Sequence, residues 1–512
     1  MVRIRSPHQL RSLIHALAMT VCTLLWLAPP SVQAHIGAQH VFFETKAGPY
    51  PVRVTIKSPQ VVPGLAEIFV RTHQDEVDTI SVLPVRYDSG RQGAPPPDLA
   101  LPVENESGLY RAELWFMKSG AHSVIVNVEG ANGSGEAMVP FDAIATRTLP
   151  MSPFLSIILA LMGILLVALA SSIAGAAVRQ AVLPPGAQPS RRRLWASRAV
   201  TFAQLVFIMG MVYLGKSWWD SEDLDYRNNQ LYEPMATEAV VQSEPTRELR
   251  LTITDDRFRR GSPLLPDHGK LMHLFLIRED SQAFAHLHPN RADWDLFANN
   301  LPALPSGNYH LFADITHETG FSHTLTNLIQ ISDAPPSAIR PGDRDDSWNI
   351  QAETPREGVT VPATIELMSE ARFPTGQEIE LNFSVFDSSR QRARLEPYMG
   401  MKSHVIVYKK DATVFSHLHP SGSISMASLQ AFESRLAGDG KPPTVAYGQL
   451  DPLCQLPSVE ESTARWWDLE NQQDGVDLTF PYAFPSSGDY KIWVQVKVDG
   501  QVVTQAFDLK VE

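Results

Sequence analysis

The chain has 512 residues, a formal net charge of −13 and 44% hydrophobic residues, a length that suggests about three or four folded units. Its acidic balance argues against nucleic acid as a partner and favours metal cations or basic proteins. Only two cysteines occur, and one falls in a predicted signal peptide, so no disulfide within the mature chain is expected.

The N-terminus has the pattern of a secretory signal peptide. Three arginines precede an apolar run over residues 16–27, and small residues form a cleavage site before position 35. We therefore expect residues 1–34 to be removed and the mature protein to begin at His35. Its α-amino group and imidazole would form a chelating pair that copper binds well.

Residues 35–147 predict a first β-sandwich. Short runs of alternating apolar and polar residues, such as 52–56 and 123–126, are separated by turns rich in Pro, Gly and Asn. No stretch of this region keeps a helical period for long, which favours strands throughout.

Two later segments, residues 152–178 and 199–215, are long and apolar enough to cross a bilayer. The loop between them, residues 179–198, carries five arginines and no acid, so the positive-inside rule places it in the cytoplasm. We expect a multi-pass protein of the bacterial inner membrane with both large domains on the periplasmic or extracellular side. Because neither span contains a carboxylate, lysine or histidine, the hairpin is interpreted as an anchor.

Residues 216–246 are acidic, lack clear periodicity and are predicted to form a stalk. Two modules follow at 247–332 and 346–512, joined by a linker at 333–345, and each module ends in two alternating runs typical of paired strands. The predicted fold class is therefore mainly β, with three exported immunoglobulin-like β-sandwich domains plus a two-helix transmembrane hairpin. The second module contains an insertion, residues 422–474, whose role the sequence does not indicate.

A histidine motif occurs once in each module. Phe-Ala-His-Leu-His-Pro ends at Pro289, and Phe-Ser-His-Leu-His-Pro ends at Pro420, 131 positions later. In each copy a further histidine lies 15 residues before the last one. The repeated histidines are His273, His286 and His288 in the first module, and His404, His417 and His419 in the second.

The spacing predicts that each set of three histidines gathers on one hairpin. If residues 280–281 form a two-residue turn, Phe275 lies opposite His286 and His273 lies opposite His288. Alternate residues of a strand point to the same side, so three imidazoles line one patch. The same register applies to the second copy.

These clusters are typical of a metal site, although imidazole suits copper, zinc, nickel and iron equally as a ligand type. Met399 and Met401 precede the second cluster, and soft thioether sulfur in an exported protein favours copper. The predicted metal ligands are the six repeated histidines, His35, Met399 and Met401, with copper as the expected ion and other transition metals as alternatives. The competing interpretation is that the histidines bond backbone groups at strand ends and the methionines belong to the core.

Further motifs surround the histidines of the second module. They are Phe-Pro-Thr-Gly at 373–376, Leu-Glu-Pro-Tyr-Met-Gly-Met at 395–401, His-Leu-His-Pro at 417–420 and Gly-Asp-Tyr at 488–490. Together they resemble the YtkA-like family of exported bacterial β-sandwich domains, and the first module looks like a shorter relative, so the resemblance covers about half of the chain. It implies an immunoglobulin-like fold and, by association with CopC-like copper-resistance domains, copper handling. A mature N-terminal histidine is also similar to the start of CopC-like proteins.

The expected function is a membrane-anchored, outward-facing metal-binding protein that sequesters copper or hands it to a periplasmic or membrane protein partner, without being an enzyme. The first alternative is a non-catalytic assembly or interaction subunit with structural histidines. The second is a metal-dependent oxygen-activating enzyme, because paired histidines with open coordination positions support such chemistry. Against it, the carboxylate that cupin sites add after the pair is missing, and no Ser-His-Asp, P-loop or dinucleotide motif occurs.

Overall fold

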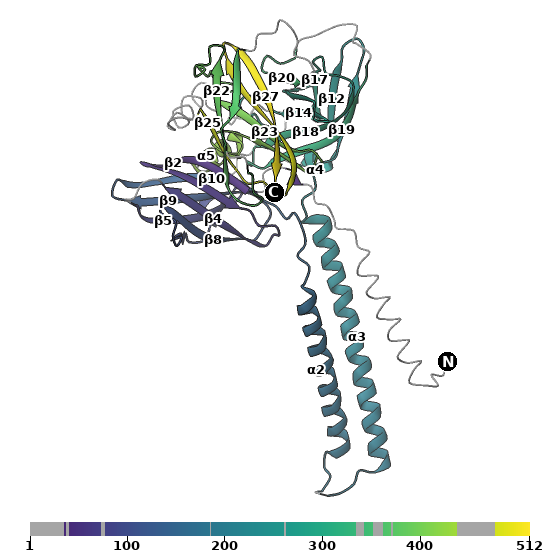
Figure 1. The fold of residues 1–512 in the computed structure, drawn as a ribbon. Coiled ribbons are helices and arrows are strands. Elements are labelled where there is room, and N and C mark those ends of the chain that lie inside the picture. Colours follow the sequence, from purple (N-terminus) through teal and green to yellow (C-terminus); the bar gives the residue numbers. More distant parts are fainter. Residues whose placement is uncertain are drawn as a thin grey trace.

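The structure, a computed structural model, describes residues 35–36, 40–72, 77–184, 186–260, 263–333, 342–351, 362–369, 372–437 and 477–512. The predicted signal peptide lies outside the described residues. Figure 1 shows a group of β-sandwiches from which two long helices extend together. The prediction of a mainly β chain is confirmed, because the described strands form several antiparallel sheets and few helices accompany them.

The N-terminal sandwich packs two sheets on one core. The first sheet runs in the order β2 (His40–Ala47), β3 (Tyr50–Lys57), β4 (Gly64–Thr72), β8 (Leu109–Phe116) and β7 (Leu101–Pro102). The second runs β10 (Gly133–Ala143), β9 (Gly120–Gly130), β5 (Val77–Arg86) and β6 (Asp98–Leu99), and a short 3-10 turn, η1, spans Arg91–Gly93. Buried and more exposed residues alternate along β4 and β8, so each strand gives one face to the shared core.

Helices α2 (Pro153–Gln180) and α3 (Arg191–Asn229) are both long and apolar enough to cross a membrane. Each begins at a serine whose Oγ accepts a hydrogen bond from a backbone N–H of the first turn, Ser152 for α2 and Ser190 for α3. The helices approach closely at Gly175, whose carbonyl oxygen accepts a 2.7 Å hydrogen bond from Ser197 Oγ.

Helix α3 is longer than the second predicted span and includes part of the predicted loop and part of the predicted stalk. Ion pairs one turn apart, Lys216 with Asp220 and Arg227 with Asp223, continue the helix beyond its apolar segment. Residues 216–229, the first part of the predicted stalk, therefore continue helix α3.

The first module also has two sheets. One runs β11 (Thr237–Gln242), β12 (Glu248–Ile253), β17 (Leu296–Asn300) and β16 (Asn290–Arg291). The other runs β13 (Leu264–Leu265), β18 (Gly307–His317), β14 (His273–Arg278), β15 (Ala283–Leu287) and β20 (Ser347–Ile350), with β19 (Ser322–Ile331) on β18 and the short helix α4 (Asp256–Arg260) nearby.

Two strands of this module differ from the predicted boundaries. Strand β11 was expected in the stalk, but it pairs with β12 and turns Ala239 and Val241 toward the core. Strand β20 was expected in the second module, but it pairs with β15 because that edge strand would otherwise leave its backbone groups unpaired.

The second module is built in the same way. Its larger sheet runs β1 (His35–Ile36), β24 (Val414–Leu418), β23 (Ser403–Lys409), β26 (Gly488–Val498) and β27 (Gln501–Val511). The smaller one runs β21 (Ala363–Leu367), β22 (Ile379–Asp387) and β25 (Leu478–Tyr482). Helix α5 (Met426–Ala437), the described part of the insertion, packs on β10 and β18 and so joins all three sandwiches.

The two modules meet through their histidine-bearing hairpins. Residues of β14, β15 and β23 are almost all buried on both faces, because one face covers the module's own core and the other covers the partner module. Eight buried residues form this second, shared core: Phe275, Ile277, Phe284, Phe312, Ile406, Tyr408, Phe415 and Trp493.

Candidate metal centre between the two modules

The repeated histidines lie at one end of the shared core. Phe275 pairs with His286 on β15, and Ile406 pairs with His417 on β24, so both hairpins have the predicted register. Because alternate residues share a face, His273 and His286 project on the same side as Phe275, toward the second module.

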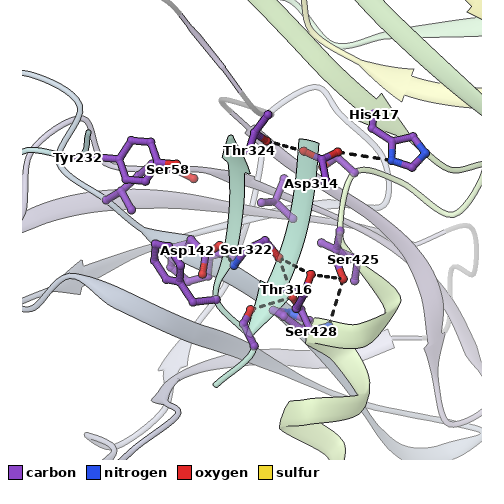
Figure 2. A pocket seen from close by; sticks show the side chains of 18 of the residues that line it. Ser58, Asp142, Tyr232, Asp314, Thr316, Ser322, Thr324, His417, Ser425 and Ser428 are labelled. Carbon is purple, nitrogen blue, oxygen red and sulfur yellow. Dashed lines mark hydrogen bonds and ion pairs between the residues drawn. The ribbon is translucent and has the colours of Figure 1, made fainter. Parts of the chain in front are cut away.

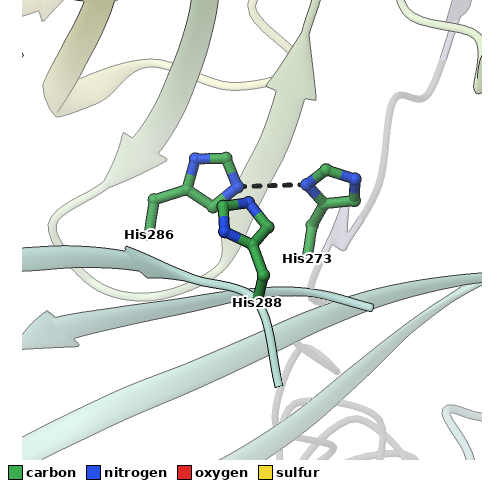
Figure 3. Close-up of side chains that lie close together, drawn as sticks. All are labelled: His273, His286 and His288. Carbon is green, nitrogen blue, oxygen red and sulfur yellow. Dashed lines mark hydrogen bonds between the residues drawn. The ribbon is translucent and has the colours of Figure 1, made fainter. Parts of the chain in front are cut away.

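The first triad, which is His273, His286 and His288, is compact (Figure 3). His273 Nδ1 lies 3.1 Å from His286 Nε2, and the ring centre of His288 lies 5.2 Å from that of His273 and 4.6 Å from that of His286. One nitrogen from each ring lies within 4.8 Å of the other two. Imidazole nitrogens bind zinc at about 2.0–2.1 Å, so a small contraction would let all three reach one ion.

Each ring of the first triad directs its other nitrogen to an oxygen atom. The contacts are His273 Nε2 with the Asp267 carbonyl oxygen (3.1 Å), His286 Nδ1 with Gln495 Oε1 (2.8 Å), and His288 Nδ1 with Asp346 Oδ1 (3.2 Å). The Asp267 carbonyl oxygen and Gln495 Oε1 accept hydrogen bonds, so in the neutral rings of His273 and His286 the single proton lies on the outward nitrogen. The inward nitrogens therefore carry lone pairs, and His288 Nε2 has no hydrogen-bond partner among the described residues.

The second triad, which is His404, His417 and His419, repeats this arrangement. His404 Nδ1 lies 3.1 Å from His417 Nε2, and one nitrogen from each of the three rings again lies within 4.8 Å of the others. The outward contacts are His404 Nε2 with the Tyr398 carbonyl oxygen (3.2 Å), His419 Nδ1 with the Ile424 carbonyl oxygen (3.3 Å), and His417 Nδ1 with Asp314 Oδ2 (3.6 Å).

The two triads form one centre, because their outward contacts cross between the modules. Asp314 pairs with His273 on the neighbouring strand, and Gln495 pairs with His404 at the equivalent position. Yet Asp314 faces His417 of the second module, and Gln495 accepts from His286 of the first. The ring centres of His273 and His417 lie 5.4 Å apart, across the interface.

Burial keeps five of the six triad imidazoles neutral. It is the largest cause that lowers the pKa of four histidines well below its usual value, and neighbouring histidines lower it further; the four are His273, His286, His404 and His417. The pKa of His419 falls to about 3 for the same reason, burial. At neutral pH a metal ion would therefore bind these rings without first displacing a proton.

His268 belongs to the centre, although the repeat did not predict it. Its Nε2 lies 3.3 Å from His419 Nε2 of the second module. His268 has a positive φ of 51° five residues before His273, and Met399 has a φ of 52° five residues before His404. Each is followed by glycine, so the two turns are equivalent. The repeated motif did not indicate His268, because the second copy has methionine at this position.

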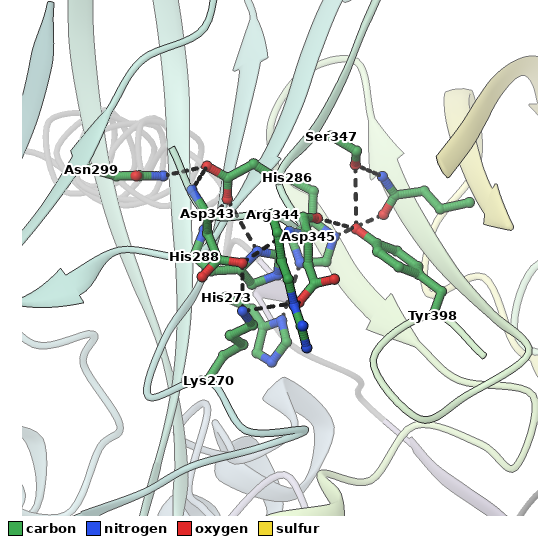
Figure 4. A network of polar contacts seen from close by, with 12 residues as sticks. Lys270, His273, His286, His288, Asn299, Asp343, Arg344, Asp345, Ser347 and Tyr398 are labelled. Atoms are coloured by element: carbon green, nitrogen blue, oxygen red, sulfur yellow. Dashed lines mark hydrogen bonds and ion pairs between the residues drawn. The ribbon is translucent and has the colours of Figure 1, made fainter. Parts of the chain in front are cut away.

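An acidic segment holds the outer side of the first triad (Figure 4). Asp346 accepts hydrogen bonds from the backbone N–H of His288 (2.8 Å) and from Asn299 Nδ2 (3.0 Å). Lys270 Nζ lies 2.5 Å from Asp343 and 3.1 Å from Asp345. The sequence analysis assigned Asp343 and Asp345 to a linker. Three aspartates within four residues, Asp343, Asp345 and Asp346, were the sequence signal for this part of the site.

The other predicted ligands have different surroundings. Met401 packs with Ile424 and Leu429 in the apolar core of the N-terminal sandwich, and its role as a metal ligand stays a prediction. Met399 is buried in the turn equivalent to that of His268. The backbone of His35 pairs with Val414 of β24, and its side chain lies outside the described residues.

Exchanging Gln495 for alanine removes the acceptor that orients His286. We expect metal affinity at the first triad to fall about 10- to 100-fold, the usual effect of losing such a partner of a metal-bound histidine. Isothermal titration of the purified protein would measure it. Gln501→Ala, an exposed glutamine of β27, is the matched control, and equal affinities for both variants would contradict the outer-contact role.

The part of the chain that contains the two modules matches a protein family. The family model described as "Domain of unknown function (DUF8832)" matches residues 231–332 and 359–512, which contain both triads. No curated protein matches the chain.

Several solved structures are similar at low identity. A tetra-tandem repeat from the extending region of a large adhesion protein is 9% identical, with a TM-score of 0.15 over 89% of this chain and 71% of that one. Latent PorU from Porphyromonas gingivalis is 9% identical, with a TM-score of 0.15 over 93% of this chain and 34% of that one. Trypsin-activated alpha-2-macroglobulin from Escherichia coli is 9% identical, with a TM-score of 0.17 over 93% and 24%. Scores of this size carry no argument about the chain.

Proposed function

Because the chain belongs to the DUF8832 family, described only as a domain of unknown function, we propose its function from the histidine centre itself. The protein is a membrane-anchored, outward-facing metal-binding protein that sequesters copper or delivers it to a partner. The two triads hold the ions, and the N-terminal sandwich and the helical hairpin position this centre at the membrane.

The observation that supports metal binding most is that unprotonated ring nitrogens of different histidines point toward one another. His273 Nε2 donates to a backbone carbonyl and His286 Nδ1 donates to Gln495, so no proton is left for the 3.1 Å contact between the two rings. Two lone pairs at this distance repel each other, and a shared cation would turn the repulsion into two bonds. Metal-bound histidines elsewhere donate their second N–H to a carbonyl or carboxylate in the same way.

The donor set favours copper among the available ions. Sites of imidazole nitrogen bind divalent metals in the Irving–Williams order, in which Cu²⁺ binds more tightly than Zn²⁺ or Ni²⁺. An ion that enters a buried site loses its water ligands, which costs free energy. Several neutral rings that bind the ion together offset this cost, and each triad provides three.

The helical hairpin supports an anchor rather than a channel. Apolar side chains such as Phe154, Ile164 and Phe207 are largely exposed along α2 and α3, as expected for helices surrounded by lipid. Arginines at the ends of the helices next to their connection, Arg179 of α2 and Arg191, Arg192 and Arg193 of α3, support a cytoplasmic connection by the positive-inside rule. The sandwiches would then lie on the periplasmic side of a bacterial inner membrane.

Copper titration of triad variants tests this function. We expect the parent protein to bind one ion per triad, the His286→Ala/His288→Ala variant to lose the ion of the first triad, and the His417→Ala/His419→Ala variant to lose that of the second. Metal content after gel filtration, with competition by a chelator of known affinity, would measure it. Removing two of three ligands leaves a site with one imidazole, which cannot hold an ion against the chelator.

His310→Ala is the control, because this half-buried histidine lies on β18 outside both triads. Circular dichroism would show that all variants keep their strands. A parent protein that binds copper no more tightly than the double variants would make the histidines structural and would leave an assembly subunit as the better interpretation.

A further inference from the structure

A cavity of about 480 Å³ lies between the three sandwiches and reaches the histidine centre. His273, His417 and His419 line one part of it, and Asp142 of the N-terminal sandwich and Tyr232 line another. Figure 2 shows Asp314 between the two, held by Thr324 on one side and facing His417 on the other. The cavity therefore reaches the imidazole rings of His273, His417 and His419.

The cavity lies at the end of the sandwiches where the helical hairpin attaches. Its lining includes Ile144 and Thr146, which precede α2, and residues 231–234, which follow α3. The two connections are tied together, because the backbone N–H of Tyr232 donates to the Ala145 carbonyl oxygen at 2.8 Å. Helices α2 and α3 leave the sandwiches together at this end (Figure 1). A solute that used this cavity would approach the histidines from the side of the helices.

The lining is suited to a cation. Its charged groups are Asp142, Asp267, Asp314, Glu233 and Lys270, and the one lysine is already paired with Asp343 and Asp345. Asp142 Oδ2 accepts from the Ser322 backbone N–H at 3.0 Å, while its Oδ1 is buried without a hydrogen-bond partner among the described residues. Burial raises the pKa of Asp142 to about 7, because no positive group compensates the carboxylate.

We propose that this cavity is the route by which metal ions enter and leave the histidine centre, and that Asp142 is a transient ligand on that route. The inference rests on the proposed function and specifies where ions enter and leave. They are exchanged at the membrane-facing end of the sandwiches. An exchange partner must then reach that end, beside the point where α2 and α3 leave the membrane.

Stopped-flow loading of the metal-free, full-length protein in detergent with Cu²⁺ tests the route. Asp142→Asn removes the charge and keeps the shape, and Ser58→Trp fills the cavity from the N-terminal sandwich. We expect each variant to load at least about tenfold more slowly, since acidic clefts raise the association rate of cations by about 10- to 1000-fold. The number of ions bound at equilibrium should stay that of the parent.

Asp98→Asn and Thr79→Trp are the matched controls, because both residues are exposed on the same sandwich outside the cavity. Their loading rates should equal the parent rate. If Asp142→Asn and Ser58→Trp load as fast as the controls, the route is wrong although copper binding stands. If the parent binds no copper at equilibrium, the proposed function and the route fail together.

Discussion

Acidifying the metal-free protein from about pH 7.5 to about pH 5.5 is expected to lower its free energy of unfolding, and the triad histidines alone contribute a loss of roughly 5–7 kcal/mol. Asp142 and Asp314 offset part of this loss, because burial raises the pKa of both carboxyls to about 7 and they take up protons in the folded state. Five of the six triad histidines have a lowered pKa in the folded protein: His273, His286, His404, His417 and His419. In the unfolded chain each titrates near 6.5. Below that pH the unfolded state binds protons that the folded state cannot, so stability is complete above about pH 6.5 and is lost as the pH falls.

Urea unfolding at the two pH values, followed by intrinsic tryptophan fluorescence, would measure this loss as a shift of the midpoint. The His286→Gln/His417→Gln variant removes two of the five histidines and should show a correspondingly smaller shift. Equal midpoints for the parent at both pH values would mean that the rings take up protons in the folded state as readily as in the unfolded state, which would also remove the argument from converging lone pairs.

Much of the local structure could be predicted from the sequence, because short-range rules determine it. The register of each hairpin follows from the turn and from strand alternation, and Phe275 does pair with His286. The turns themselves begin one residue earlier than predicted, because the N–H of Ser281 donates to the Arg278 carbonyl oxygen and that of Ala412 to the Lys409 carbonyl oxygen, and Ser281 and Ala412 have a positive φ. Local patterns therefore sufficed to place three histidines on each hairpin.

Contacts between the modules could not be predicted in this way. Nothing in the repeat indicates that Gln495 serves His286 or that Asp314 faces His417, because these pairs are more than 100 residues apart in the chain. The signal for the interface was present in another form. Phe275, Phe312 and Phe415 occupy outward positions of their strands, and apolar residues on both faces of a strand indicate that both faces are covered.

The observed strands depart from the predicted boundaries where a segment pairs with a distant part of the chain. Strand β20 lies beyond the linker in sequence, but it completes the sheet of the first module. The same segment brings Asp346 to His288. The chain returns to the first module after the linker. For this reason acidic residues to which the sequence assigns no role become part of the site.

Trp493→Ala is expected to destabilise the contact between the modules by about 3–5 kcal/mol, the usual cost of removing a large buried aromatic side chain. Trp493 is 1% exposed, and its ring stacks on Phe284 of the first module with centres 4.7 Å apart. Because Gln495 lies two residues further on the same face of β26, loosening this contact would also withdraw Gln495 from His286. Copper affinity should fall at both triads, although neither loses a histidine.

Trp115→Ala is the control for this variant, since Trp115 is 64% exposed on the N-terminal sandwich and its removal should change the free energy of unfolding by no more than about 0.5 kcal/mol. Trp493→Phe should restore most of the copper affinity, because a smaller ring can still stack on Phe284. Urea midpoints and copper competition on the same preparations would separate the two effects. If Trp493→Ala lost stability but kept the copper affinity of the parent, each triad would bind its ion alone, and the crossed contacts of Gln495 and Asp314 would serve only to join the modules.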